Sequence, residues 1–337
     1  MLRFLLLPLL AILALSLAVA AVPAPKEAEK LTGILVLDDC DDQYRGKEAY
    51  QDNLTVLDPA GKQVFRVSGF NNCQSIGSSR MVAADPARKC IWTIENVACR
   101  IRRFDLAGQE TLTIAGVTGS AIAVDPDTGN IWALASEGPI GTGKTVVYDN
   151  KGKEVASYDI SGWDIAYDRK AKAFWIAERK LTKLTAAKGE VVCSVGVSTW
   201  CASSVDIDPR SGAAWVAVRE HPQVPGSSNR LLKFDAEGKK LVAIDLGEKD
   251  PFRVSADPKD GSVWVAHLGK AVERFSADGK SQAEHAVKAL AVQVDPAGGN
   301  AWVVTPMGVQ KMTPKGDVLK RVDHAGKTSQ AWIASLE

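Results

Sequence analysis

The sequence predicts an all-β fold, a seven-bladed β-propeller. A phrase that begins with a small and β-branched run, turns at an Asp and continues into a Trp occurs six times. Its copy at Ala121 to Trp132 reads Ala-Ile-Ala-Val-Asp-Pro-Asp-Thr-Gly-Asn-Ile-Trp. The pairs are Asp85/Trp92, Asp125/Trp132, Asp168/Trp175, Asp208/Trp215, Asp257/Trp264 and Asp295/Trp302. Successive Asp residues are 38 to 49 positions apart, and a period near 40 residues with short strands is typical of propeller blades.

Each part of the phrase fits one part of a blade. Val, Ile and Ala suit a strand that is buried on both faces. The Asp-Pro step starts a turn, because Pro presets φ and the Asp carboxylate can accept free backbone N–H groups. The Trp begins the next strand and can bury roughly 150–250 Å² between neighbouring sheets. Because one blade cannot cover both of its faces, the blades must stack around a ring.

The first and last segments are expected to share a blade. The hairpin from Asn53 to Val67 follows a strand at Gly33 to Leu37 and lacks an innermost strand. The C-terminal segment from Gly326 to Ala334 aligns with Gly116 to Val124, which ends in an innermost strand. We therefore expect six complete blades and one composite blade closed by the C-terminal strand, which removes exposed sheet edges.

The N-terminus has the features of a signal peptide over residues 1–20. Arg3 supplies a positive start, an apolar run extends from Phe4 to Ala20, and Ala18-Val19-Ala20 is a small-residue cleavage site. An uncleaved anchor is the alternative, since the run is long enough for a short span. Residues 21–31 are predicted to be a disordered leader, and residues 32–337 a single propeller domain. We expect an exported, monomeric protein, periplasmic or secreted, with no membrane span after cleavage.

Charge and motifs argue against two classes of ligand. A formal net charge of +1 gives no electrostatic reason to bind nucleic acid or acidic membranes. Gly138 to Thr145 matches the phosphate-binding loop pattern, but Val146 to Asp149 continue as a strand where that loop requires a helix. We interpret this segment as a rim loop.

Six cysteines are consistent with an exported, oxidised protein. Proximity in the sequence suggests the disulfides Cys40–Cys73, Cys90–Cys99 and Cys193–Cys201. The alternative for Cys90, which lies beside Ile91 and Trp92, is a buried free thiol.

Loops of variable length follow the Trp strands. The long ones, Asp38–Asp52, Glu137–Lys144 and Glu220–Asn229, should all emerge on one face, here called the long-loop face. Elaboration on a single face marks the binding side of a repeat protein. We expect a protein or glycan partner to bind there.

The phrase from Ile122 to Ala133 resembles the NHL-type repeat and the repeat of streptogramin lyases such as the virginiamycin B lyases. In those lyases a Glu with His residues near the channel mouth serves a metal-assisted elimination. Trp92-Thr-Ile-Glu95 and Trp175-Ile-Ala-Glu178 resemble the lyase phrase Trp-Phe-Thr-Glu, and His267 resembles a lyase His. The resemblance makes Glu95, Glu178 and His267 the candidate catalytic residues, with Mg²⁺ or Ca²⁺ as the candidate cofactor.

Other polar residues could also bind a metal. Asp38 takes the position of Glu95 in the first blade, and lactonase-type propellers hold calcium with carboxylate and Asn or Asp ligands, so Asp38, Glu95, Asn96 and Asp206 are candidates. Asp164, Asp206 and Arg253 stand on innermost strands where other blades have Ala or Ser. These three are expected to pair with one another, and a cation site is the alternative.

The favoured interpretation of Glu95, Glu178 and His267 is that they are solvated residues of the rim. The chain has no His-Glu-x-x-His, no Cys-x-x-Cys and no serine nucleophile elbow. We therefore predict a binding module without a cofactor. A metal-dependent lyase or a lactonase-type enzyme is the alternative.

Overall fold

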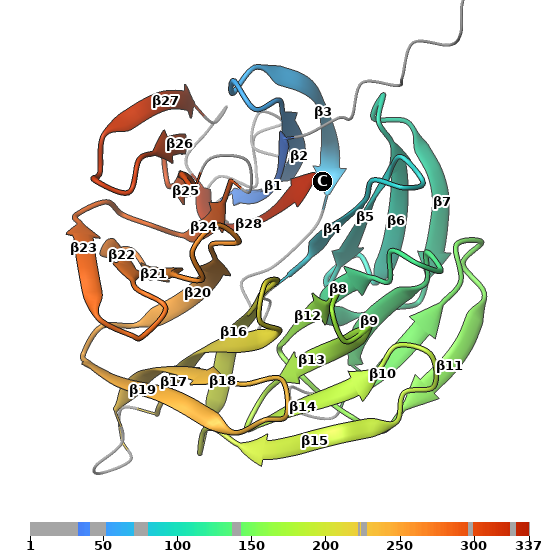
Figure 1. The fold of residues 1–337 in the computed structure, drawn as a ribbon. Coiled ribbons are helices and arrows are strands. Elements are labelled where there is room, and N and C mark those ends of the chain that lie inside the picture. Colours follow the sequence, from blue (N-terminus) through green and yellow to red (C-terminus); the bar gives the residue numbers. More distant parts are fainter. Residues whose placement is uncertain are drawn as a thin grey trace, which may run out of the picture. The chain divides into compact units, whose positions relative to one another are not determined.

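The computed structural model describes residues 33–40, 52–70, 80–136, 143–221, 223, 228–295, 299–323 and 328–336. Met1–Lys30 form a unit separate from Leu31–Glu337. The described residues of the second unit form twenty-eight strands in seven four-stranded antiparallel sheets around a common axis (Figure 1). The chain is an all-β β-propeller, as predicted.

Six sheets consist of four consecutive strands, numbered here from the propeller axis outward. They are β4 (Val82–Asp85), β5 (Cys90–Glu95), β6 (Arg100–Asp105) and β7 (Glu110–Ala115); β8 (Gly119–Val124), β9 (Ile131–Ser136), β10 (Gly143–Tyr148) and β11 (Glu154–Tyr158); β12 (Asp164–Asp168), β13 (Ala173–Ala177), β14 (Lys180–Thr185) and β15 (Val191–Gly196); β16 (Cys201–Asp208), β17 (Ala213–Arg219), β18 (Asn229–Phe234) and β19 (Lys240–Gly247); β20 (Pro251–Ala256), β21 (Val263–His267), β22 (Ala271–Phe275) and β23 (Ser281–His285); β24 (Ala291–Val294), β25 (Ala301–Thr305), β26 (Gly308–Met312) and β27 (Val318–Asp323).

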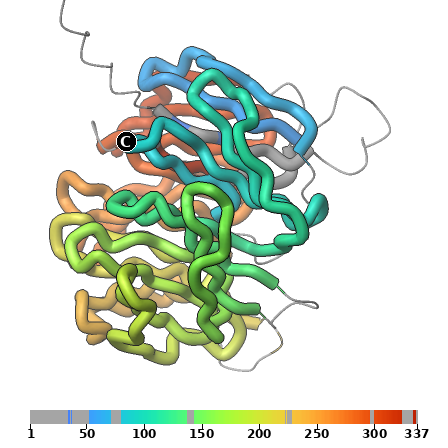
Figure 2. Tube along the Cα trace, turned by 90° about the vertical axis from the view of Figure 1, so that its right-hand side faces the viewer, coloured from blue at the N-terminus to red at the C-terminus, as the bar shows by residue number. Residues whose placement is uncertain are grey.

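The remaining sheet joins the two ends of the domain. It contains β28 (Thr328–Leu336), β1 (Gly33–Cys40), β2 (Asp52–Leu57) and β3 (Gln63–Phe70), in that order. β28 pairs antiparallel with β1 from Gly33↔Leu336 to Asp38↔Ala331, and it contacts both β24 and β4. Figure 2 shows the blue first strands beside the red last strands.

The repeated Asp/Trp phrase builds the inner half of each blade. The six Trp residues are among the largest fully buried side chains of the described chain. The Asp side chains close the turn before them. In the copy at Asp125, Oδ1 accepts the Asp127 N–H at 3.0 Å, Oδ2 accepts the Thr128 hydroxyl at 2.6 Å, and Gly129 supplies the positive φ of 76°.

A cation on the third strand covers the Trp in four of these blades. The distances from cation to ring centre are 5.5 Å for Arg103 over Trp92, 5.0 Å for Lys183 over Trp175, 4.7 Å for Lys233 over Trp215 and 5.1 Å for Lys311 over Trp302. Each cation also donates to a carbonyl of the neighbouring sheet: Asn150, Ala236, Ala277 and Pro59, respectively, at 2.6 to 3.1 Å. Each of these cations therefore links its own blade to an outer hairpin of the neighbouring blade. The sequence analysis did not predict this link.

Two of the predicted disulfides are wrong, because Cys90, Cys99, Cys193 and Cys201 are free. Cys90 begins β5 and Cys99 lies beyond the other end of that strand, about 20 Å away at roughly 3.3 Å per residue. A disulfide needs Cα atoms within about 7 Å. Cys193 lies on the outermost strand of its sheet, whereas Cys201 begins the innermost strand of the next one.

Two further expectations concern segments that are only partly described. Cys73 lies outside the described residues, so the pairing Cys40–Cys73 stays a prediction. The segment after Gly143 is β10, a strand rather than the helix that a phosphate-binding loop requires. No helix in the described parts of the chain is long and apolar enough to cross a membrane.

Candidate functional site

The long-loop face is formed by the ends of the second and third strands together with the connections between sheets. In one blade, the N–H groups of Gly116 and Val117 in such a connection donate to the carbonyl of Cys99 at 2.8 and 3.1 Å. In another, the Val197 N–H donates to Arg179 at 2.9 Å. Most of the three long loops lies outside the described residues, so their described ends and the connections beside them define this face.

Glu95 is a buried ion-pair residue and not a solvated residue of the rim. Its Oε1 accepts from Arg102 Nε at 2.6 Å and from Arg100 Nε at 2.9 Å. Arg102 in turn pairs with Glu110 at 3.2 Å and lies 4.1 Å from the centre of the Phe70 ring. The expectation of solvation is wrong here because the last residue of β5 turns toward cations on the adjacent β6.

His267 is also fully buried. Its Nε2 lies 3.1 Å from Glu273 Oε2, which also accepts from Lys249 at 2.8 Å, while Ser281 donates to the other oxygen at 2.7 Å. Burial alone would raise the pKa of Glu273, but the hydrogen bonds from His267, Lys249 and Ser281 outweigh it and lower the pKa to about 2. The expected solvation is therefore wrong for His267 as well.

Glu178 follows β13 and is half-buried, and its Oε2 accepts the Ser161 hydroxyl at 2.7 Å. Glu95, Glu178 and His267 thus belong to three different blades, each with partners of its own. Of Asp38 only the backbone is described. Within the described residues, no group of three or more His, Cys, Asp or Glu is placed to hold a metal ion.

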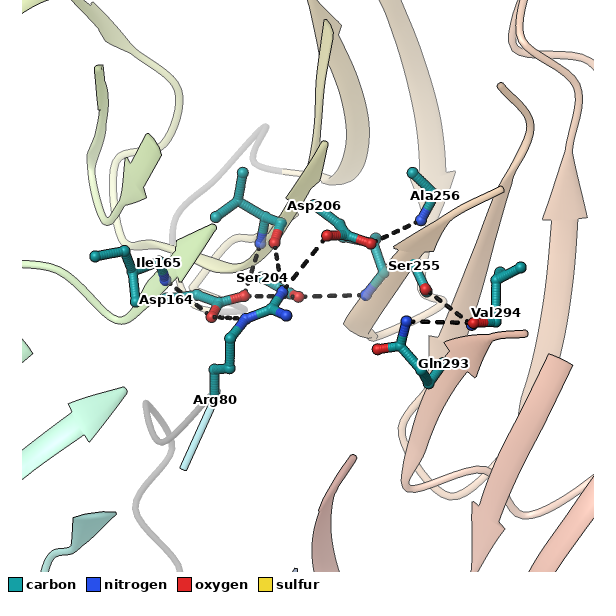
Figure 3. A network of polar contacts seen from close by, with 11 residues as sticks. Arg80, Asp164, Ile165, Ser204, Asp206, Ser255, Ala256, Gln293 and Val294 are labelled. Carbon is teal, nitrogen blue, oxygen red and sulfur yellow. Dashed lines mark hydrogen bonds and ion pairs between the residues drawn. The ribbon is translucent and has the colours of Figure 1, made fainter. Parts of the chain in front are cut away.

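A polar network lies where the innermost strands approach the propeller axis (Figure 3). Arg80, in the connection before β4, reaches Asp164 Oδ1 at 3.4 Å, the Val205 carbonyl at 3.0 Å and Asp206 Oδ1 at 3.7 Å. Asp164 also accepts from the Ser204 hydroxyl at 3.0 Å and from the Val205 N–H at 2.9 Å. The two carboxylates are therefore paired, as predicted, but their partner is Arg80.

Arg253, the expected partner, faces an aromatic ring instead. Its guanidinium lies 3.9 Å from the centre of the Phe252 ring and donates to the Phe252 carbonyl at 2.8 Å. Burial lowers the pKa of Arg253 to about 9. The repeat did not identify Arg80 as a partner of these carboxylates. Arg80 precedes β4 and lies five residues before the turn Asp of its blade, whereas Asp164 and Arg253 lie four residues before theirs.

Side chains of this network also connect successive innermost strands. Asp164 accepts a hydrogen bond from the Val205 N–H, and Ser204 accepts one from the Val254 N–H at 3.3 Å. In the same way, Asp206 accepts from the Ala256 N–H and Ser255 accepts from the Val294 N–H, both at 2.9 Å. Each side chain thus satisfies a backbone donor on the inner edge of the next blade. An unpaired edge would otherwise need solvent.

An aromatic and charged cluster lies on the long-loop face beside the Glu220–Asn229 loop. Trp200, half-buried in the connection between β15 and β16, makes an edge contact with His221 at 5.3 Å between ring centres. Arg219 lies 5.6 Å from the centre of the Trp200 ring and is itself paired with Asp250 through two nitrogens, at 2.5 and 2.8 Å. The Thr199 hydroxyl donates to Glu220 at 2.7 Å. Several contacts therefore fix the indole while part of it stays accessible.

The fold and these sites define a β-propeller with a polar axis and an aromatic cluster on one face. No family model matches the chain, and no curated protein matches it. Among solved structures, the chain is similar to Kuenenia stuttgartiensis hydrazine synthase, with a TM-score of 0.63 and 16% identity over 79% of this chain and 90% of that chain. At this identity the similarity shows the propeller fold alone.

Proposed function

We propose that this protein is an exported, monomeric seven-bladed propeller of the NHL-type and streptogramin-lyase-like class that binds a protein or glycan partner on its long-loop face. The observation that carries the proposal is the cluster around Trp200. A half-exposed Trp beside Arg and His is the composition of a binding hot spot. Because its neighbours hold the indole, little side-chain entropy would be lost on binding.

The seventh blade in this proposal is the sheet that contains β28. Two contacts support it: β28 lies against both β24 and β4, and Lys311 of β26 donates to Pro59 in the turn between β2 and β3. Both would link the last blade to the first, so the ring would have no open edge.

The binding test compares Trp200→Ala with Leu241→Ala. Leu241 is 51% exposed on an outer strand, so its variant controls for the loss of exposed apolar surface elsewhere. The mature protein would be immobilised and exposed to soluble envelope extract and to a glycan array. We expect Trp200→Ala to weaken binding at least tenfold, whereas Leu241→Ala leaves it unchanged. Equal binding by both variants would exclude the Trp200 surface.

The alternative is a metal-dependent lyase or lactonase that uses Glu95, Glu178 and His267. The contacts of these residues weigh against it. The carboxylate of Glu95 already accepts hydrogen bonds from Arg100 and Arg102, and the imidazole of His267 is hydrogen-bonded to Glu273. A catalytic set would have to break these buried pairs. Stoichiometric metal in the purified protein that is lost in Glu178→Ala would favour the enzyme.

A further inference from the structure

The residue paired with the repeated Trp on the innermost strand is equivalent in six blades. These residues are Ala83, Ala123, Ala166, Asp206, Ser255 and Gln293. Three consecutive blades thus have a methyl group at this position and the next three have polar side chains. Asp206 carries the single charge of this set.

The connection between blades does not require the charge of Asp206. Ser255, one blade further on, accepts the Val294 N–H at 2.9 Å with a neutral hydroxyl, and Asp206 accepts the Ala256 N–H at the same distance. Burial raises the pKa of Asp206 although Arg80 opposes the shift, so ionising this carboxyl group costs more in the folded protein than in the unfolded chain. A charge kept under such conditions indicates a role besides stability.

Three polar groups around the axis have unused hydrogen-bonding capacity. Asp206 Oδ1 lies 3.7 Å from Arg80 Nη2, which is beyond hydrogen-bond distance. Arg80 uses Nε and Nη2, while Nη1 makes no hydrogen bond to any described residue. The amide nitrogen of Gln293 faces the Val294 carbonyl at 3.4 Å, and its carbonyl oxygen points toward Arg80 (Figure 3). The side chains of Arg80 and Asp206 are each 21% exposed, so solvent reaches them.

We propose that Arg80, Asp206 and Gln293 form a binding site at the propeller axis for a small zwitterion, an α-amino acid. Its carboxylate accepts from Arg80 Nη1, and its ammonium group donates to Asp206 Oδ1 and to the Gln293 carbonyl oxygen. Among the described residues of the network, the charged side chains are those of Arg80, Asp164, Asp206 and the neighbouring Arg253, whose formal charges sum to zero and match a ligand without net charge. This site does not depend on the partner proposed for the long-loop face.

Calorimetric titration with L-alanine tests the site directly. L-Lactate, which lacks the ammonium group, and ethanolamine, which lacks the carboxylate, are the matched control ligands. We expect saturable binding of alanine and none of either control. No binding of alanine, or equal binding of lactate, would overturn the proposal.

Two variants separate binding from folding. Asp206→Asn keeps an acceptor for the Ala256 N–H but loses the charge, so the affinity for alanine should fall about 10- to 100-fold, the worth of a hydrogen bond to a charged group. Ser255→Ala removes the equivalent connection to Val294 and should lower the melting temperature while leaving the alanine affinity unchanged. Unchanged affinity in Asp206→Asn would refute the assignment.

The pH profile gives an independent readout. The charges that act on Asp206 are those of Arg80 and Asp164, and the arginine keeps its charge at acidic pH. The wild-type affinity should therefore decrease as the pH falls and Asp206 takes up a proton, whereas the residual affinity of Asp206→Asn should depend less on pH. Parallel profiles for the two proteins would contradict the role of Asp206.

Discussion

The substitution Trp215→Ala tests whether the repeated phrase identifies the structural core. Trp215 is fully buried, its Nε1 donates to the Gly261 carbonyl of the next blade at 3.3 Å, and Lys233 lies over its ring. Loss of a buried Trp costs about 3–5 kcal/mol. The lost hydrogen bond adds about 1 kcal/mol and the lost cation–π contact about 1 kcal/mol. We therefore expect a loss of about 5–7 kcal/mol, a large part of a typical free energy of unfolding of about 5–15 kcal/mol.

Urea unfolding followed by circular dichroism measures this loss without relying on the fluorescence of the residue that is changed. Trp200→Ala is the matched control, because Trp200 is the same residue type outside the phrase and is half-buried. Its loss should be about 1 kcal/mol, in the ordinary range for one substitution. Equal losses for the two variants, or a loss below about 2 kcal/mol at Trp215, would refute this reasoning.

Three further predictions concern buried and titrating groups. Glu95→Ala leaves the buried Arg102 without its carboxylate and should destabilise the protein by about 3–5 kcal/mol, measured by urea unfolding; a loss near zero would mean that Glu95 is solvated. Cys99 is exposed and should react with an alkylating reagent in the native protein. Cys201 should react only after unfolding, because burial raises its pKa to about 11. If mass mapping shows that neither thiol can be alkylated until the protein is reduced, this prediction is wrong. Because the folded pKa of Glu273 is lowered to about 2, its contribution to stability is complete above its unfolded value near 4.3 and is lost as the pH falls toward 2, so Glu273→Gln should flatten the stability curve over that interval; an unchanged acid limb would argue against the Glu273 network.

The architecture could be predicted because its signals are local. The Asp that closes a turn and the Trp seven positions later are neighbours in one β-hairpin, so their spacing carries the information that the sheet needs. The strand pairing at the two ends of the domain was also predictable, since the segment after Gly326 matches an innermost strand of another blade.

The environment of each side chain depends on neighbours that are distant in the sequence. Glu95 was expected to be solvated, but Arg100 and Arg102 surround it because β5 and β6 pair in one register. Arg80 contacts Asp164, which is 84 positions away. No local pattern encodes such a contact, because it arises only when the innermost strands converge on one axis.

The cysteines show the converse: residues that are close in the sequence can lie far apart in the fold. Proximity in the sequence suggested Cys193–Cys201, yet the two residues lie on the outer and the inner strand of successive sheets. In a propeller, the short connection between two sheets runs from the outermost strand of one sheet to the innermost strand of the next. Residues at its two ends are close in the sequence but far apart in space.

Site-specific photo-crosslinking tests the proposed binding function most directly. A photoreactive residue at position 200 would report on the long-loop face, and one at position 241 on an exposed outer strand as the control. Both proteins would be irradiated in intact source cells. The proposal predicts one specific adduct from position 200 and none from position 241. An adduct from position 241 alone, or no adduct from either position, would contradict a partner on the long-loop face.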